Sequence, residues 1–139
     1  MKILYTNFQQ ADEGGHTSYV MSLARILCEK SQVTVAAPAG SRLLTEAGAL
    51  PGVRAVALDF KGGPLRQLRA LRRLRALLRD GRFDVVHANG SADQRLCMLA
   101  ALGLGARRPF MVHAQPRLAQ RPRAADSLGA LSRLRGPRA

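Results

Sequence analysis

The sequence predicts an α/β fold, a Rossmann-like parallel sheet with helices on both of its faces. Short apolar runs alternate along the chain with longer segments in which apolar residues recur at helical spacing. The first apolar run leads through a pair of glycines directly into a helical pattern, which is how a βαβ unit begins. A length of 139 residues and a hydrophobic content of 47% fit a single globular domain.

The first strand is predicted at residues 3–5, where an apolar run is typical of a strand buried on both faces. A polar loop follows and ends at Gly14 and Gly15, after which apolar residues recur with a helical period. Thr17 and Ser18 are predicted to cap this helix. Glycines allow close backbone approach to a ligand, and a helix N-terminus attracts anions, but a tight turn alone also explains the pair.

Four further strands and three further helices follow by the same criteria. Strands that alternate with helices predict a sheet whose strands are all parallel and whose crossovers are right-handed. Ser41 is predicted to cap the second helix. The predicted strands are residues 33–37, 53–60, 84–88 and 109–113, and the predicted helices are residues 42–47, 65–79 and 92–102.

The positive charge of the chain is concentrated in two segments. The formal net charge is +13, whereas residues 1–60 are neutral overall. Residues 61–82 hold eight basic residues against Asp80, and residues 107–139 hold eight arginines against Asp126, so each segment carries +7. The basicity therefore belongs to one helix and one tail, and not to the fold as a whole.

The composition favours a cytoplasmic protein without a metal or cofactor. Cys28 and Cys97 both fall among apolar residues of predicted helices, which predicts buried thiols and no disulfide or metal site. No apolar run approaches the roughly 20 residues of a membrane span. The short apolar run before Asn7 does not fit a signal peptide.

The glycine loop does not match the two common nucleotide-binding patterns. Gly14-Gly15-His16 departs from G-x-G-x-x-G, and the second strand ends in Ala-Ala-Pro where a dinucleotide-binding protein carries an acidic residue. The P-loop pattern G-x-x-x-x-G-K-[ST] is absent as well. A dehydrogenase and a P-loop ATPase are therefore disfavoured.

The arginine-rich helix has two interpretations. A helix that covers the sheet with a solvated basic face is the favoured one. The alternative is contact with anionic lipid headgroups or an anionic acceptor, because basic amphipathic helices bind membrane surfaces. Nucleic acid is disfavoured as a partner, since the chain has no Trp and few aromatic residues for base stacking. The expected buried stripe is Leu65, Leu68, Leu71, Leu74 and Leu78, and the candidate surface residues are Arg66, Arg69, Arg72, Arg73, Arg75 and Arg79.

Candidate site residues follow from the rule that parallel sheets bind ligands beyond the carboxyl ends of their strands. That rule selects the loop of residues 7–15 and the segments that follow Val86 and Val112. The alternatives remain that Ser91 or Asp93 only caps the next helix and that His87 is a core histidine. The candidate binding residues are Gly14, Gly15, His16, His87, Asn89, Gly90, Ser91 and Asp93.

The runs KILYT, GGHTSYVMSLARIL and DVVHANGSAD together resemble the N-terminal, acceptor-side domain of family 4 glycosyltransferases of the two-Rossmann-domain (GT-B) type. The resemblance covers residues 1 to about 113. It implies metal-independent sugar transfer from a nucleotide-sugar donor to a glycan or lipid-linked acceptor. It also implies that His113 lies beside the transferred sugar as the catalytic candidate. Many relatives are peripheral membrane proteins, so an association with the inner face of the membrane is an additional expectation.

The resemblance ends after His113 and leaves the Rossmann-like domain incomplete at the C-terminus. Residues 114–139 are rich in Ala, Arg and Pro, which suggests a truncated or frameshifted enzyme; the alternative is a disordered basic tail. Without the donor-binding C-terminal domain, the fragment is expected to be inactive alone. The competing function class is a non-enzymatic basic α/β module that binds an anionic membrane surface through residues 64–80.

Overall fold

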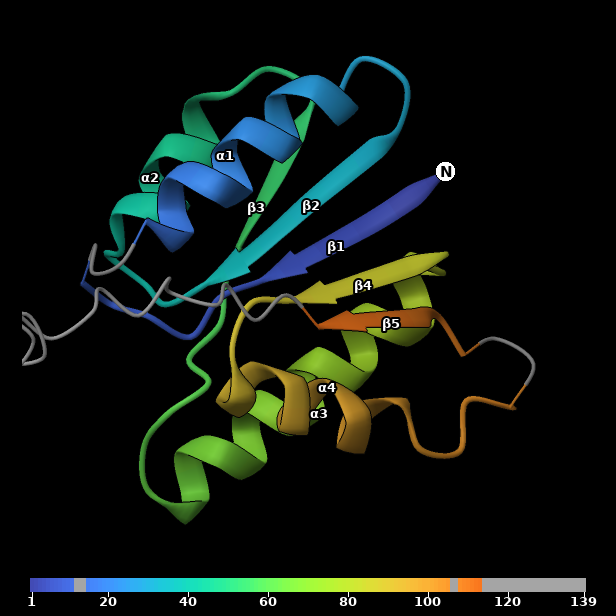
Figure 1. The fold of residues 1–139 in the computed structure, drawn as a ribbon. Coiled ribbons are helices and arrows are strands. Elements are labelled where there is room, and N and C mark those ends of the chain that lie inside the picture. Colours follow the sequence, from blue (N-terminus) through green and yellow to red (C-terminus); the bar gives the residue numbers. More distant parts are fainter. Residues whose placement is uncertain (12–14, 106–107, 114–139) are drawn as a thin grey trace, which may run out of the picture.

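The computed structural model describes residues 1–11, 15–105 and 108–113, which form one α/β sheet structure (Figure 1). Strands and helices alternate along the chain, as the sequence predicts. In order, the elements are β1 (Lys2–Thr6), α1 (His16–Leu27), β2 (Gln32–Ala37), α2 (Arg42–Ala49), β3 (Val53–Ala57), α3 (Pro64–Gly81), β4 (Val85–Ala88), α4 (Ser91–Ala101) and β5 (Phe110–His113).

The five strands form a parallel sheet in the order β3-β2-β1-β4-β5, which confirms the predicted fold class. Helices α1 and α2 cover one face of the sheet, and α3 and α4 cover the other (Figure 1). The chain runs outward from β1 to β3 and then returns to the other side of β1 as β4. The strand order therefore reverses between β1 and β4, the position at which such sheets bind ligands.

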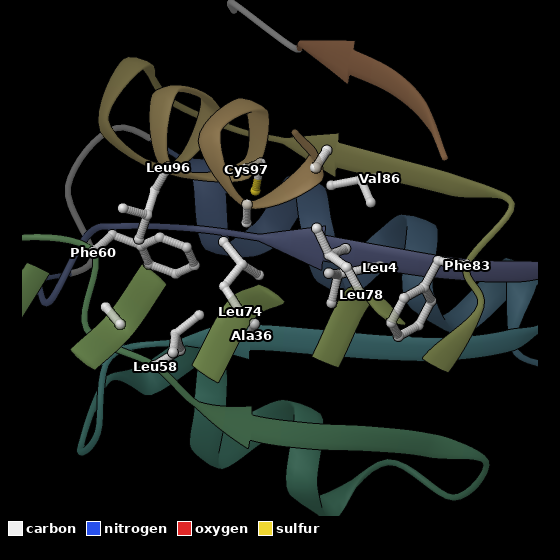
Figure 2. Close-up of a cluster of buried hydrophobic side chains, with 13 residues drawn as sticks. Leu4, Ala36, Leu58, Phe60, Leu74, Leu78, Phe83, Val86, Leu96 and Cys97 are labelled. Atoms are coloured by element: carbon white, nitrogen blue, oxygen red, sulfur yellow. The ribbon is translucent and has the colours of Figure 1, made fainter. Parts of the chain in front are cut away.

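Each face of the sheet has its own hydrophobic cluster. On the α1 and α2 side, Val20 and Leu43 pack with Val35 from the sheet. On the α3 and α4 side, Leu74 packs with Leu4 and other sheet residues (Figure 2). Because both faces are covered, Ile3, Leu4 and Tyr5 are buried in succession along β1 and do not alternate with polar residues.

Strand β3 ends at Ala57, three residues before the predicted end. The Leu58 N–H still donates to the Ala37 carbonyl at 2.9 Å. The neighbouring strand then reaches Pro38, whose nitrogen carries no hydrogen, so pairing cannot continue. Leu58 and Phe60 instead turn into the cluster beneath α3 (Figure 2).

The predicted leucine stripe on α3 is wrong at its N-terminal end. Leu74 and Leu78 are buried together with Ala70, but Leu65 is 72% exposed and Leu68 is 43% exposed. The cause is a difference in length. Helix α3 has 18 residues and is about 27 Å long, whereas a strand of five residues spans about 17 Å. The first turns of α3 therefore extend beyond the sheet.

Helix α1 begins earlier than predicted, and its N-cap is Gly15, not Thr17 or Ser18. Gly15 has a left-handed backbone conformation with φ 75°, which favours glycine over residues with a Cβ. Thr17 is buried inside the first turn instead. The prediction for α2 is confirmed, because the Leu44 N–H donates to the Ser41 side chain at 3.3 Å.

Candidate functional site

The carboxyl ends of β1, β4 and β5 lie side by side at one edge of the sheet. Thr6 is paired in register with Ala88, and Ala88 with His113. All three histidines of the chain lie near this edge, since His16 opens α1 and His87 is the penultimate residue of β4. The sheet register thus brings the residues predicted after β4 and β5 together.

His87 lies between two tyrosine rings on the α1 side of the sheet. The centroid of its ring is 5.3 Å from that of Tyr5 and 5.9 Å from that of Tyr19, and the Tyr19 contact is edge-on. Its Nε2 atom is buried without a hydrogen-bond partner. Burial, and secondarily the nearby His113, lower the pKa of His87 below its ordinary value. A neutral imidazole at neutral pH is therefore expected, and it can accept or donate a proton.

Asp93 joins α4 to the ends of β1 and β4. Its side chain is fully buried, and Oδ2 accepts hydrogen bonds from the Thr6 hydroxyl at 2.8 Å and from the Asn89 N–H at 2.9 Å. Burial raises the pKa of the Asp93 carboxyl, and the hydrogen bonds from Thr6 and Asn89 oppose that shift. Asp93 therefore links the loop after β4 to the end of β1, and it does not cap α4, which has no side-chain capping bond.

Gly90 is required where the loop after β1 contacts the loop after β4. A Cβ atom at this position would lie 2.0 Å from Cε1 of Phe8, so any side chain would displace that ring. Gly90 is also the N-cap of α4, and it makes no side-chain capping bond. Ser91 is the exposed first residue of the helix, so the alternative in which Ser91 caps α4 is wrong.

The glycine loop is only partly described. Gly15 is the N-cap of α1, and no side chain caps the helix. The backbone N–H groups of its first turn therefore have no side-chain hydrogen-bond acceptor from a cap. His16 has a buried, unpartnered Nδ1. Gly14 and the two acids before it lie outside the described residues.

Buried polar atoms without hydrogen-bond partners are concentrated at this edge. Within residues 1–11, 15–105 and 108–113, every such side-chain atom belongs to a residue at the carboxyl end of β1, β4 or β5, or to the first turn of α1 or α4. An unpaired buried polar group costs about 1–3 kcal/mol. The atoms are Nδ2 of Asn7, Nδ1 of His16, Nε2 of His87, both amide atoms of Asn89, Oδ1 of Asp93 and Nδ1 of His113.

Sequence reasoning missed several residues of this edge. Thr6 and Asn7 are almost fully buried at this edge. The rule for carboxyl ends selects the loop of residues 7–15, but it names neither Thr6 nor Asn7 as a site residue. A sequence feature was available, because two polar residues directly follow the apolar run of β1. The contact of Tyr19 with His87 joins α1 to β4, and no spacing in the sequence indicates it.

The described residues contain no group of three or more His, Cys, Asp or Glu side chains that could hold a metal ion. Cys97 is buried, and burial raises the pKa of its thiol to about 12. Cys28 is a half-buried C-cap of α1 and not a buried helix residue, which corrects the expectation for it. No helix in the part of the chain that the structure describes has the length and apolar character needed to cross a membrane.

The sequence profile of Glycosyltransferase Family 4 matches residues 13–137. This chain belongs to glycosyltransferase family 4. The match includes the candidate residues of the glycine loop, β4 and β5, and it extends into the segment after His113. A comparison with curated protein sequences finds no significant match.

Solved structures support the Rossmann-like fold of this family 4 chain. The crystal structure of Acinetobacter baumannii MurG matches with a TM-score of 0.62 and 17% identity, over 81% of this chain and 34% of MurG. Anabaena Alr3699/HepE, solved in complex with UDP and glucose, matches with a TM-score of 0.54 and 18% identity, over 80% of this chain and 28% of HepE. The chain thus corresponds to about a third of each enzyme, in its N-terminal part.

Proposed function

We propose that this chain is the acceptor-binding half of a glycosyltransferase that transfers a sugar from a nucleotide-sugar to a glycan or lipid-linked acceptor. Two observations support this proposal: the family membership, and the unpartnered polar atoms at the edge of the sheet where the strands end, called the carboxyl edge below. These atoms are ready to bind hydroxyl groups, and a polar ligand would remove the cost of leaving them unpaired.

In the proposed reaction, an acceptor hydroxyl attacks the anomeric carbon of the donor, and the nucleoside diphosphate leaves. His113 ends β5 beside His87, and its Nδ1 atom is buried and unpartnered. The His113 imidazole orients the groups near the anomeric carbon. The N–H groups at the start of α1 contribute to binding the diphosphate charge. Asn89 orients the hydroxyl groups through both of its unpaired amide atoms, and Asn7 does so through its unpaired Nδ2.

The activity of the whole enzyme requires a second half that binds the nucleotide-sugar. The test supplies the C-terminal domain of a family 4 enzyme as a separate chain and measures transfer of labelled sugar from UDP-, GDP- and ADP-sugars. We expect sugar transfer only when both chains are present. The His113→Ala variant should lower the rate of transfer about 10²–10⁴-fold. Gln67→Ala, an exposed change on α3, is the control. Wild-type transfer by His113→Ala would remove the role of His113.

A second candidate function is binding to an anionic membrane surface through the first turns of α3. The exposed Leu65 and Leu68 share a helix face with Arg69 and Arg72, which are also exposed. Exposed leucines among arginines are typical of helices that lie on a lipid surface. By contrast, Arg75 is engaged with the Leu102 carbonyl at 2.7 Å and Arg79 with Asp80 at 2.9 Å.

Co-sedimentation with phosphatidylglycerol vesicles at low and high salt tests the membrane candidate. We expect the Arg69→Gln/Arg72→Gln/Arg73→Gln variant to lose most of its binding, because each basic residue near the surface contributes about 1 kcal/mol. The matched control removes three positive charges elsewhere, in Arg25→Gln/Lys30→Gln/Arg54→Gln. Equal losses in both variants would show a general charge effect and contradict a specific surface on α3.

A further inference from the structure

A cavity of about 550 Å³ opens at the carboxyl ends of β1, β2 and β3, beside the candidate site. The loops after these three strands line it, together with the start of α3. Its size lies in the range typical of small-molecule sites, and it is larger than a single ion needs. Phe8 lines this cavity and also contacts Gly90, so the cavity adjoins the loop after β4.

The cavity carries a net positive charge. Among the described residues that line it, Lys61 and Arg66 are basic and Asp59 is the single acid. In the described part of the chain, none of these three side chains forms an ion pair, so both cations are available to a ligand. Helix α3 begins here without a side-chain cap or an acidic residue in its first turn, so its N-terminal dipole adds to the positive potential.

Local packing holds the two cations in place. The Lys61 amine lies 4.0 Å from the centroid of the Phe8 ring, in a cation–π contact. Arg66 packs on Gly62, where a Cβ atom would lie 3.0 Å from Cδ of Arg66 and where φ is 140°. Elsewhere in the lining, the Gln10 Nε2 donates a hydrogen bond to the Ala39 carbonyl at 2.9 Å, which connects the loops after β1 and β2.

We propose that this cavity binds a phosphate group of the acceptor, with Lys61 and Arg66 as its ligands. Arg presents a planar set of donors that fits phosphate oxygens, and Lys supplies a compact charge. Phe8 and Pro38 offer apolar surface to the group that carries the phosphate. The inference rests on the proposed function, because it defines the acceptor class as phosphorylated. The phosphate can be borne by a soluble sugar or by a lipid.

The test is calorimetric titration of the full chain with glucose 1-phosphate, with dihexanoylphosphatidic acid and with glucose. We expect at least one of the two phosphates to bind and glucose not to bind; the tighter phosphate identifies the source. Lys61→Met and Arg66→Met should each weaken binding about tenfold or more, since a charge-assisted hydrogen bond contributes about 1.5–3 kcal/mol.

The matched control is Arg25→Met, which removes an exposed arginine of α1 that neither lines the cavity nor lies on the arginine-rich helix. Equal weakening by Arg25→Met and Arg66→Met, binding of glucose as tight as that of its phosphate, or no binding of either phosphate would overturn the proposal. Circular dichroism of each variant verifies folding, and all three substituted side chains are exposed. Binding without sugar transfer in the two-chain assay would contradict the proposed function alone, and transfer without phosphate binding would contradict this inference alone.

Discussion

All five strands start at one edge of the sheet, the amino edge, and end at the opposite edge, the carboxyl edge. The two edges differ in how their polar groups are paired. At the amino edge, three polar groups of Asp84 form hydrogen bonds. Its N–H donates to the Lys2 carbonyl at 2.9 Å, its Oδ2 accepts from the Lys2 N–H at 2.7 Å, and its carbonyl accepts from the Phe110 N–H at 2.8 Å. Asp84 therefore links the start of β4 to β1 and β5.

At the carboxyl edge, the fold leaves polar atoms of Asn89, Asp93 and His87 buried without partners. No unpartnered buried side-chain atom lies at the amino edge within the residues that the structure describes. Since proteins pair nearly all buried polar groups, the imbalance supports the carboxyl edge as the proposed ligand site. The comparison shows that polar pairing is complete among the buried side chains described at one edge and incomplete at the other.

The largest difference is expected between Asp93→Ala and Asp84→Ala. Asp93→Ala leaves the Thr6 hydroxyl buried without an acceptor, while the Asn89 N–H keeps its 3.2 Å bond to the Thr6 carbonyl. The free energy of unfolding should therefore fall by about 1–3 kcal/mol. Asp84 is exposed, so water replaces its carboxylate and the loss should be about 1 kcal/mol or less. Urea denaturation measures both. Asp93→Asn keeps one acceptor oxygen and should lose less than Asp93→Ala; equal losses at the two edges would contradict the comparison.

A smaller effect of opposite sign is expected for Asn89→Ala. The Asn89 amide has no hydrogen-bond partner, so its removal should leave stability unchanged or raise it by up to about 1 kcal/mol. Sugar transfer in the two-chain assay should fall at the same time. Denaturation and transfer are measured on the same sample. A stability loss above about 2 kcal/mol would mean that Asn89 is a structural residue.

The fold was predictable because its determinants are local. Ile3, Leu4 and Tyr5 are all buried in β1, and a fully apolar run of this kind indicates a parallel strand covered on both faces. The cap at Ser41 is likewise visible in the sequence. The end of α3 nearest Leu65 was not predictable, because helical periodicity identifies a face but not how far the sheet beneath it extends.

The site was predictable only at the level of segments. The rule for carboxyl ends selected the loops that contain His87, Asn89 and His113, and the register brings these loops together. The pairing of Thr6 with Asp93 spans 87 positions in the chain. The contact of Phe8 with Gly90 likewise joins two distant loops. Such long-range contacts depend on tertiary packing, and a single sequence carries no local pattern for them.

The smallest effect tests the electrostatic coupling of the two histidines at the carboxyl edge. The pKa of His87 is lowered mainly by burial and further by His113, so its NMR titration midpoint should lie below the ordinary value of 6.5. His113→Gln removes the titratable charge and keeps a side chain of similar size. The midpoint should therefore rise part of the way back and remain below the ordinary value, because burial is the larger cause.

The sign of the stability effect follows from the lowered pKa. The folded protein binds a proton at His87 less readily than the unfolded chain does. The contribution of neutral His87 is therefore complete above the unfolded pKa of about 6.5 and is lost as the pH falls through the folded pKa. His113→Gln should bring the folded pKa of His87 closer to the unfolded pKa, so stability should be lost over a narrower pH range. Urea denaturation at a series of pH values measures this range. A wild-type midpoint at or above the ordinary value would show that the His87 ring is solvated, and the contrast between the two edges would lose one of its supports.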